Sequence, residues 1–185
     1  IGCTTTGSNT FSSSNSGFTN KKNERPAPPI NMEIIIPVFD GGIEKDETGK
    51  VVDEVKRAEA LYFATKVKRH IEDRKFFFNP KVMPSARAAG DIYLHGNIIK
   101  SNGLELKVKI TAEDSSGRRL YTKTYSHKCD QKCASRVTGN PRFGSKDRFE
   151  YAVYRKIAID LEKYISKKRR SDLQKIRNTT EIKFA

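Results

Sequence analysis

The three cysteines are the residues of this sequence whose type and spacing point most directly to chemistry. Cys129 and Cys133 form a Cys-x3-Cys pair, whereas Cys3 stands alone near the start of the chain. An odd cysteine beside a close pair is what a secreted disulfide plus a separately modified thiol would leave. We expect a local disulfide between Cys129 and Cys133, with two free thiols in a loop as the alternative.

A metal site is the third reading of this pair, because His127 lies beside it and His95 would be available as a fourth ligand. A structural zinc site usually combines one close cysteine pair with a second such pair or with a pair of histidines. Only half of that pattern is present here. We therefore predict that the chain holds no metal.

Catalytic motifs do not accompany these residues. The sequence has no Gly-rich phosphate loop, no Gly-x-Ser-x-Gly elbow and no His-Glu-x-x-His motif, and its three histidines are scattered. We predict that the protein is not an enzyme and has no catalytic residues.

Cys3 has a context that favours covalent lipid. Ile1-Gly2-Cys3 looks like the tail of a bacterial lipobox, in which signal peptidase cuts before a cysteine that then carries acyl chains. A run rich in Ser, Thr and Asn follows, as a lipid-anchored domain needs in order to stand clear of the membrane. The alternative is a chance Gly-Cys in a truncated sequence. A lipid on Cys3 is the one cofactor that we predict.

Lysines and tyrosines that alternate along two expected strands suggest a binding surface. If neighbouring strands pair in the simplest register, one polar sheet face would collect Lys107, Lys109, Tyr121, Lys123 and Tyr125. Tyrosines interleaved with lysines on a sheet can stack and neutralise single-stranded RNA. The ribonucleoprotein signature is missing, so a solvated or protein-covered face is favoured over nucleic acid.

These side chains require a two-layer α+β domain to position them. Alternating and helical hydrophobic patterns predict the order β-α-β-β-β-β-α, a mostly antiparallel sheet with two amphipathic helices on one face. The expected strands are 32–39, 76–83, 91–99, 104–113 and 118–126, and the expected helices are 53–73 and one that begins at 147.

Three regions follow from this pattern. Residues 1–29 form a polar, flexible tether, 30–166 form the α+β domain, and 167–185 form a basic extension that would begin a missing segment. The net charge of +14 favours anionic partners such as nucleic acid, lipid headgroups or acidic proteins. No apolar run approaches the roughly 20 residues that cross a bilayer.

Five segments resemble, in order, a group of envelope lipoproteins of diderm bacteria over residues 33–185: "IIIPVFDGGI", "RAEALYFATKVKRHIED", "GDIYLHGNIIKSNGLELKVKITAEDSSGRRLYTKTY", "DRFEYAVYRKIAIDLEKY" and "IRNTTEIKFA". The layout is more distantly similar to the periplasmic domain of the curli-secretion lipoprotein and to the N-terminal domain of Tol translocation protein B. The Cys129/Cys133 pair is not part of the family's pattern.

The resemblance implies a small α+β fold that builds envelope assemblies, often as rings beneath the outer membrane. It transfers no catalytic residue. It implies a structural or accessory subunit of a secretion or motility machine, whose partners are other subunits in a homo- or hetero-oligomer. Thr4, rather than aspartate, follows Cys3, which by the lipoprotein sorting rule points to the periplasmic face of the outer membrane. The alternative is a cytoplasmic RNA-binding module.

Overall fold

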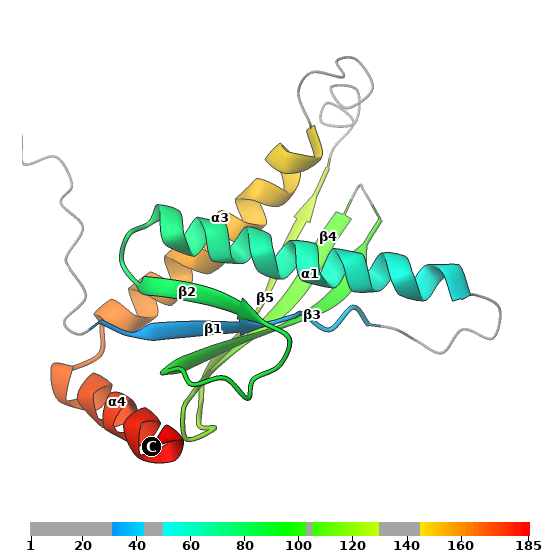
Figure 1. Cartoon of the computed structure of the whole chain (residues 1–185). Coiled ribbons are helices and arrows are strands. Elements are labelled where there is room, and N and C mark those ends of the chain that lie inside the picture. The colour runs from blue at the N-terminus through cyan, green and yellow to red at the C-terminus, as the bar shows by residue number, and fades with distance from the viewer. Residues whose placement is uncertain (1–30, 43–49, 103–104, 130–144) are drawn as a thin grey trace, which may run out of the picture.

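A computed structural model describes residues 31–42, 50–102, 105–129 and 145–185 (Figure 1). Its elements are one sheet and the helices that pack around it. Along the chain they are β1 (Glu33–Pro37), α1 (Lys50–Asp73), β2 (Phe78–Met83), β3 (Ile92–Ser101), β4 (Glu105–Asp114), β5 (Arg119–Lys128), α3 (Ser145–Ser166) and α4 (Arg170–Phe184). The α+β class predicted from the sequence is confirmed, and the predicted order is followed by one more helix.

The sheet is mixed, with strand order β2-β1-β3-β4-β5. The first strand, β1, lies inside the sheet and runs parallel to both β2 and β3, whereas β3, β4 and β5 form an antiparallel meander. Parallel neighbours cannot be joined by a tight hairpin, and α1 makes the crossover from β1 to β2. The first strand of the chain is therefore interior, and the edges of the sheet are β2 and β5.

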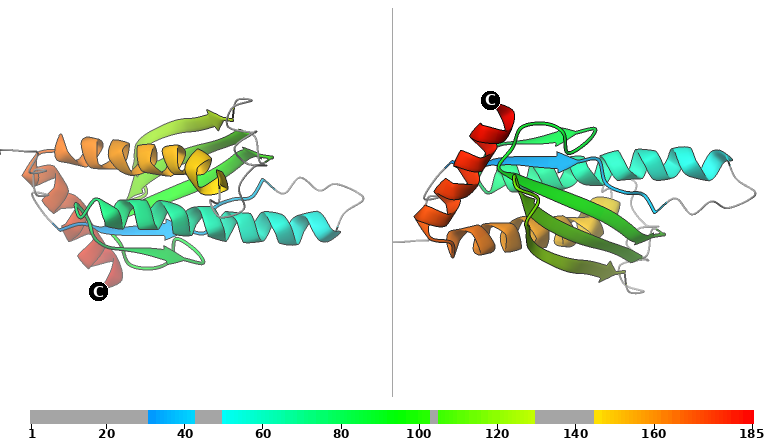
Figure 2. Two further views of the ribbon diagram at one scale, coloured as in Figure 1. Left: turned by 90° about the horizontal axis from the view of Figure 1, so that it is seen from above. Right: turned by 90° about the horizontal axis from the view of Figure 1, so that it is seen from below.

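One face of the sheet carries the core. On β4, Leu106, Val108 and Ile110 are buried, and the lysines between them, Lys107 and Lys109, point to the opposite face. This alternation follows from the two-residue period of a strand. Figure 2 shows α1 and α3 on one side of the sheet, and the opposite side open over most of β3, β4 and β5.

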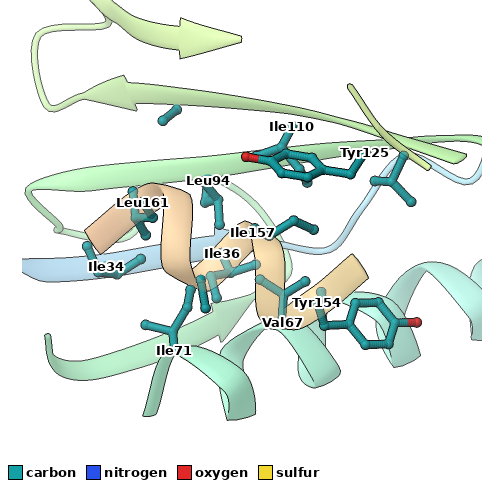
Figure 3. Packing of buried hydrophobic residues seen from close by; sticks show 14 of the residues in the cluster. Ile34, Ile36, Val67, Ile71, Leu94, Ile110, Tyr125, Tyr154, Ile157 and Leu161 are labelled. Carbon is teal, nitrogen blue, oxygen red and sulfur yellow. The ribbon is translucent and has the colours of Figure 1, made fainter. Parts of the chain in front are cut away.

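The two covering helices contribute apolar stripes at helical spacing. Phe63, Val67 and Ile71 of α1 and Ile157 and Leu161 of α3 are at most 1% exposed. Figure 3 shows several of these side chains meeting Ile34, Ile36 and Leu94 of the sheet. An ion pair between Arg74 and Glu162, both mostly buried, also links the end of α1 to α3.

A bulge at the start of β5 changes which side chains of that strand face the core. The turn that follows β4 is closed by a hydrogen bond from the amide of Gly117 to the carbonyl of Asp114, 2.9 Å, and Gly117 has φ +84. Glu113 pairs with Arg119, but Ala112 pairs with Tyr121, so Leu120 is an extra residue. An extra residue shifts the alternation by one and exchanges the two faces of the strand beyond it.

Helix α4 forms where the sequence predicts only a basic extension. Leu173 and Ile176 are buried and belong to the same apolar cluster as the core of the sheet. The hydroxyl of Ser115 donates to the carbonyl of Ile176 at 3.0 Å, and Lys183 Nζ donates to the carbonyl of Ser115 at 3.0 Å. The helix is thus fixed to the β4–β5 turn, beside which Figure 1 shows it. None of the described helices has the length and apolar character needed to span a bilayer.

Candidate functional site

A cleft of about 530 Å³ lies between the β4–β5 turn and α4. One wall is the turn and the first residues of β5, including Arg119. The other wall comes from the junction between α3 and α4 and from α4 itself, with Lys168 and Lys175. Segments that lie far apart in the sequence therefore bring four basic side chains, including Arg118, to one hollow.

Both carboxylates that line this cleft already have an arginine partner. Asp114 Oδ2 lies 2.9 Å from Arg118 Nε, and Asp172 Oδ2 lies 3.2 Å from Arg169 Nε. Within the part of the chain that the structure describes, Arg119, Lys168 and Lys175 have no carboxylate at ion-pair distance. The cleft is therefore net basic.

A second, smaller hollow of about 320 Å³ adjoins the first, and Tyr164 lines both. In it Lys123 is paired with Asp160 at 2.6 Å, whereas Lys163 and Lys167 have no carboxylate partner among the described residues. We call the two hollows together the basic cleft, and we define its unpaired cations as Arg119, Lys163, Lys167, Lys168 and Lys175.

Aromatic rings form part of the cleft wall. The ring centroids of Tyr121 and Tyr164 are 5.1 Å apart, and Lys168 Nζ lies 4.6 Å from the centroid of Tyr164. Burial raises the pKa of Tyr121 well above the usual phenol value, which is itself far above physiological pH, so this ring is neutral. The cleft thus joins fixed positive charge to uncharged aromatic surface.

The polar sheet face that the sequence predicts is not formed, and this prediction is wrong for three of its five residues. Lys107 and Lys109 lie on the open face, but Tyr121, Lys123 and Tyr125 lie on the helix-covered face, because of the bulge in β5. Tyr125 is 2% exposed and pairs with Val108, and Lys123 reaches Asp160 on α3. The tyrosines are therefore unavailable as a stacking platform on the open face.

A small hollow of about 330 Å³ on the open face contains Asp40, His95, Asn97 and Lys109. Several of its polar groups form hydrogen bonds or ion pairs with one another or with a neighbouring strand. Asn97 Nδ2 donates to Asp40 Oδ2 at 3.1 Å, and His95 Nε2 lies 3.7 Å from Glu113. This hollow therefore presents less uncompensated charge than the basic cleft.

The structure describes one of the three cysteines. Cys129 follows β5, is 9% exposed and is disulfide-bonded. Cys133, which the sequence predicts as its partner, and Cys3, the predicted lipid site, lie outside the described residues. Among the residues that are described, no three His, Cys, Asp or Glu side chains are arranged to hold a metal ion. His95 pairs with Thr111 on the open face of the sheet, whereas His127 pairs with Leu106 on the helix-covered face.

Sequence reasoning identified one part of the basic cleft. The run 167–170 is the densest basic cluster of the chain, and the sequence pattern places it in the predicted basic extension 167–185. The cleft itself depends on the docking of α4 against the β4–β5 turn, a contact between residues 61 apart in sequence. The hydrophobic pattern of a short sequence segment cannot predict such a contact.

Comparison with known proteins gives structural likenesses only. No protein-family model matches the chain, and no curated protein matches it. The hypothetical protein CT253 from Chlamydia trachomatis superposes with a TM-score of 0.46 and 13% identity, over 74% of this chain and 99% of that chain. A PelC dodecamer structure from Paraburkholderia phytofirmans gives a TM-score of 0.44 and 15% identity, over 75% and 92%. At these levels neither likeness assigns a family or a function.

Proposed function

We propose that the protein is a non-enzymatic lipoprotein of the bacterial cell envelope, anchored to the periplasmic face of the outer membrane through lipid on Cys3. In this proposal it serves as a structural or accessory subunit of an envelope complex, such as a secretion or motility machine. The observation that best supports the proposal is the position of Asn31, where the chain enters the folded domain. The carbonyl of Asn31 accepts a hydrogen bond from Arg177 Nη1 of α4 at 2.6 Å.

This contact places the entry of the chain at the end of the domain that also holds α4 and the basic cleft. Residues before Asn31, with Cys3 among them, therefore join the domain at its basic end. A lipid on Cys3 would bring that end toward a membrane surface. Two or more acyl chains anchor a protein stably, and each Lys or Arg near an anionic surface contributes about 1 kcal/mol more, so the basic end of the domain would add to the anchoring by lipid.

Other envelope subunits are the proposed partners, in a homo- or hetero-oligomer. The open face of the sheet (Figure 2) carries Lys107 and Lys109, and neither residue lines the basic cleft. A subunit that uses its basic end for one contact would still have the open face available for another. The RNA-binding alternative has lost its main support, because Tyr125 is buried on the opposite face from Lys107 and Lys109.

The proposal is tested by the chemistry of Cys3 in the native host. Mass spectrometry of the protein extracted from membranes should show a diacyl or triacyl increment on the peptide that contains Cys3. Cys3→Ser should move the protein from the membrane fraction to the soluble fraction, whereas the matched change Cys133→Ser should leave it in the membrane fraction. An unmodified Cys3 in membrane-extracted protein would refute the anchor.

A further inference from the structure

We propose that the basic cleft binds a phosphate group, and that in the cell this phosphate is carried by the headgroup of an anionic phospholipid. The phosphate site follows from the cleft alone, and only the choice of a lipid as its source rests on the proposed function. The argument depends on charge, on rigidity and on the apolar side chains of α4.

Charge is the first step. Elsewhere in the described chain many basic side chains have a carboxylate close by, as in Lys68–Glu72 at 2.6 Å and Lys100–Glu105 at 2.7 Å. The five unpaired cations of the basic cleft lack such a partner within the described residues. Like charges gathered around one hollow repel one another, and a bound anion relieves that repulsion.

Rigidity of the walls is the second step. The carboxylate of Asp114 accepts hydrogen bonds from the amides of Ser116 and Arg118, each at 3.0 Å, which fixes the turn. The bond from Ser115 to the carbonyl of Ile176 then fixes α4 against that turn. Arg119 and the lysines of the other wall are thus attached to backbone that is already positioned, so binding orders little besides the side chains.

The geometry favours phosphate over a carboxylate. A carboxylate has two oxygens and can be satisfied by an arginine and a few neighbouring donors, as Asp114 is by Arg118 and Ser116 in the same cleft. A phosphate has more acceptor oxygens and can be approached from both walls, by Arg119 on one side and by Lys168 and Lys175 on the other. Leu120 and Tyr164 add apolar surface to the lining.

Helix α4 favours a membrane over a soluble anion as the source. Ile182 is 81% exposed and Phe184 is 38% exposed, on the same helix that supplies Lys175 to the cleft. A helix that presents basic and large apolar side chains together is typical of segments that lie in the headgroup region of a bilayer. Figures 1 and 2 show α4 at one end of the molecule, apart from the two helices that cover the sheet.

The test uses the 185-residue chain without acyl lipid, so that any binding comes from the folded protein and not from the lipid. Vesicles of phosphatidylcholine containing one quarter phosphatidylglycerol are compared with pure phosphatidylcholine by co-sedimentation. The cleft variant is R119Q/K168Q/K175Q. The control variant, R87Q/K107Q/K109Q, removes equal charge from the open face and a surface loop, at residues that also lack a carboxylate partner in the described chain.

We expect the native chain and the control to bind the anionic vesicles and to ignore the neutral ones. The cleft variant should bind about a hundredfold more weakly than the native chain, and the control less than about threefold more weakly. Far-UV circular dichroism and thermal melts establish that both variants fold. Equal losses in the two variants would overturn the proposal, since binding would then follow net charge alone.

A second arm separates the source of the phosphate. Inorganic phosphate is titrated into the chain while amide NMR shifts of Arg119, Lys168 and Lys175 are followed. Shifts at these residues, together with loss of vesicle binding only in the cleft variant, support a lipid headgroup. Shifts without any preference for anionic vesicles overturn the lipid source, and no response to either probe overturns the phosphate site. An unmodified Cys3 in native protein would refute the proposed function, but it would not change the vesicle binding or the phosphate titration.

Discussion

Truncation of Leu173 in α4 tests whether this helix is part of the core. The side chain is 0% exposed and belongs to the apolar cluster that continues into the sheet. Burial of a whole leucine side chain contributes about 1.5–3 kcal/mol, and the cavity left by Leu→Ala raises the measured loss to about 3–5 kcal/mol. We expect Leu173→Ala to lower the free energy of unfolding by about 3 kcal/mol.

Leu61 on α1 provides the matched control, because it is the same residue type in a helix but is 50% exposed. Leu61→Ala removes less buried surface and leaves no enclosed cavity, so its loss should stay below about 1 kcal/mol. Urea denaturation followed by circular dichroism measures both. Similar small losses for the two variants, or a separate early transition for α4 in the native chain, would refute the docking of this helix.

Further predictions concern the interior. Burial lowers the pKa of His70, whose ring lies 4.6 Å from that of Tyr151, so the unfolded chain takes up a proton that the folded chain resists. Its contribution to stability is present above about pH 6.5 and is lost as the pH falls below that value. Between pH 7.5 and pH 5.5 the urea midpoint should therefore fall less in His70→Gln than in the native chain. An equal fall of the midpoint in both proteins would contradict this. Glu162→Gln removes the charge that faces Arg74 where the two side chains are 10% and 18% exposed, and we expect a loss of about 2–4 kcal/mol in urea, partly recovered in Arg74→Met/Glu162→Leu. Gly96→Ala would place Cβ 2.5 Å from the ring of Phe39; calorimetry should show a loss of about 1–3 kcal/mol, which a second change, Phe39→Leu, reduces if the clash is the cause.

Much of the fold could be predicted from the sequence, because its elements carry strong periodic signals. Leu106, Val108 and Ile110 alternate with lysines, and β4 lies where this alternation predicts a strand. The interior position of β1 and its two parallel partners could not be predicted, since pairing partners depend on contacts far apart in sequence. Helix α4 escaped prediction because only Leu173 and Ile176 mark its buried side among mostly polar residues.

The basic cleft could not be predicted because it depends on the docking of α4. The binding face predicted on the sheet was wrong because of one residue in β5. A regular hairpin would have placed Tyr125 opposite Lys107, but the bulge at Leu120 places it opposite Val108, on the covered face. A strand with tyrosines and lysines on one side and threonines and serines on the other gives no clear sign of which side is buried. The hydrophobic pattern of β5 alone therefore could not fix its register.

The hydrogen bond between Arg177 and Asn31 joins residues 146 positions apart, and it bears on the order in which the domain can form. As the chain is synthesised, β1 has no neighbour until β2 and β3 follow, and Leu173 and Ile176 are made after the other buried residues of the described core. Contacts with such large sequence separation slow the search for the native state. Completion of folding must therefore wait until α4 has been synthesised, and until then part of the apolar interior is accessible to chaperones.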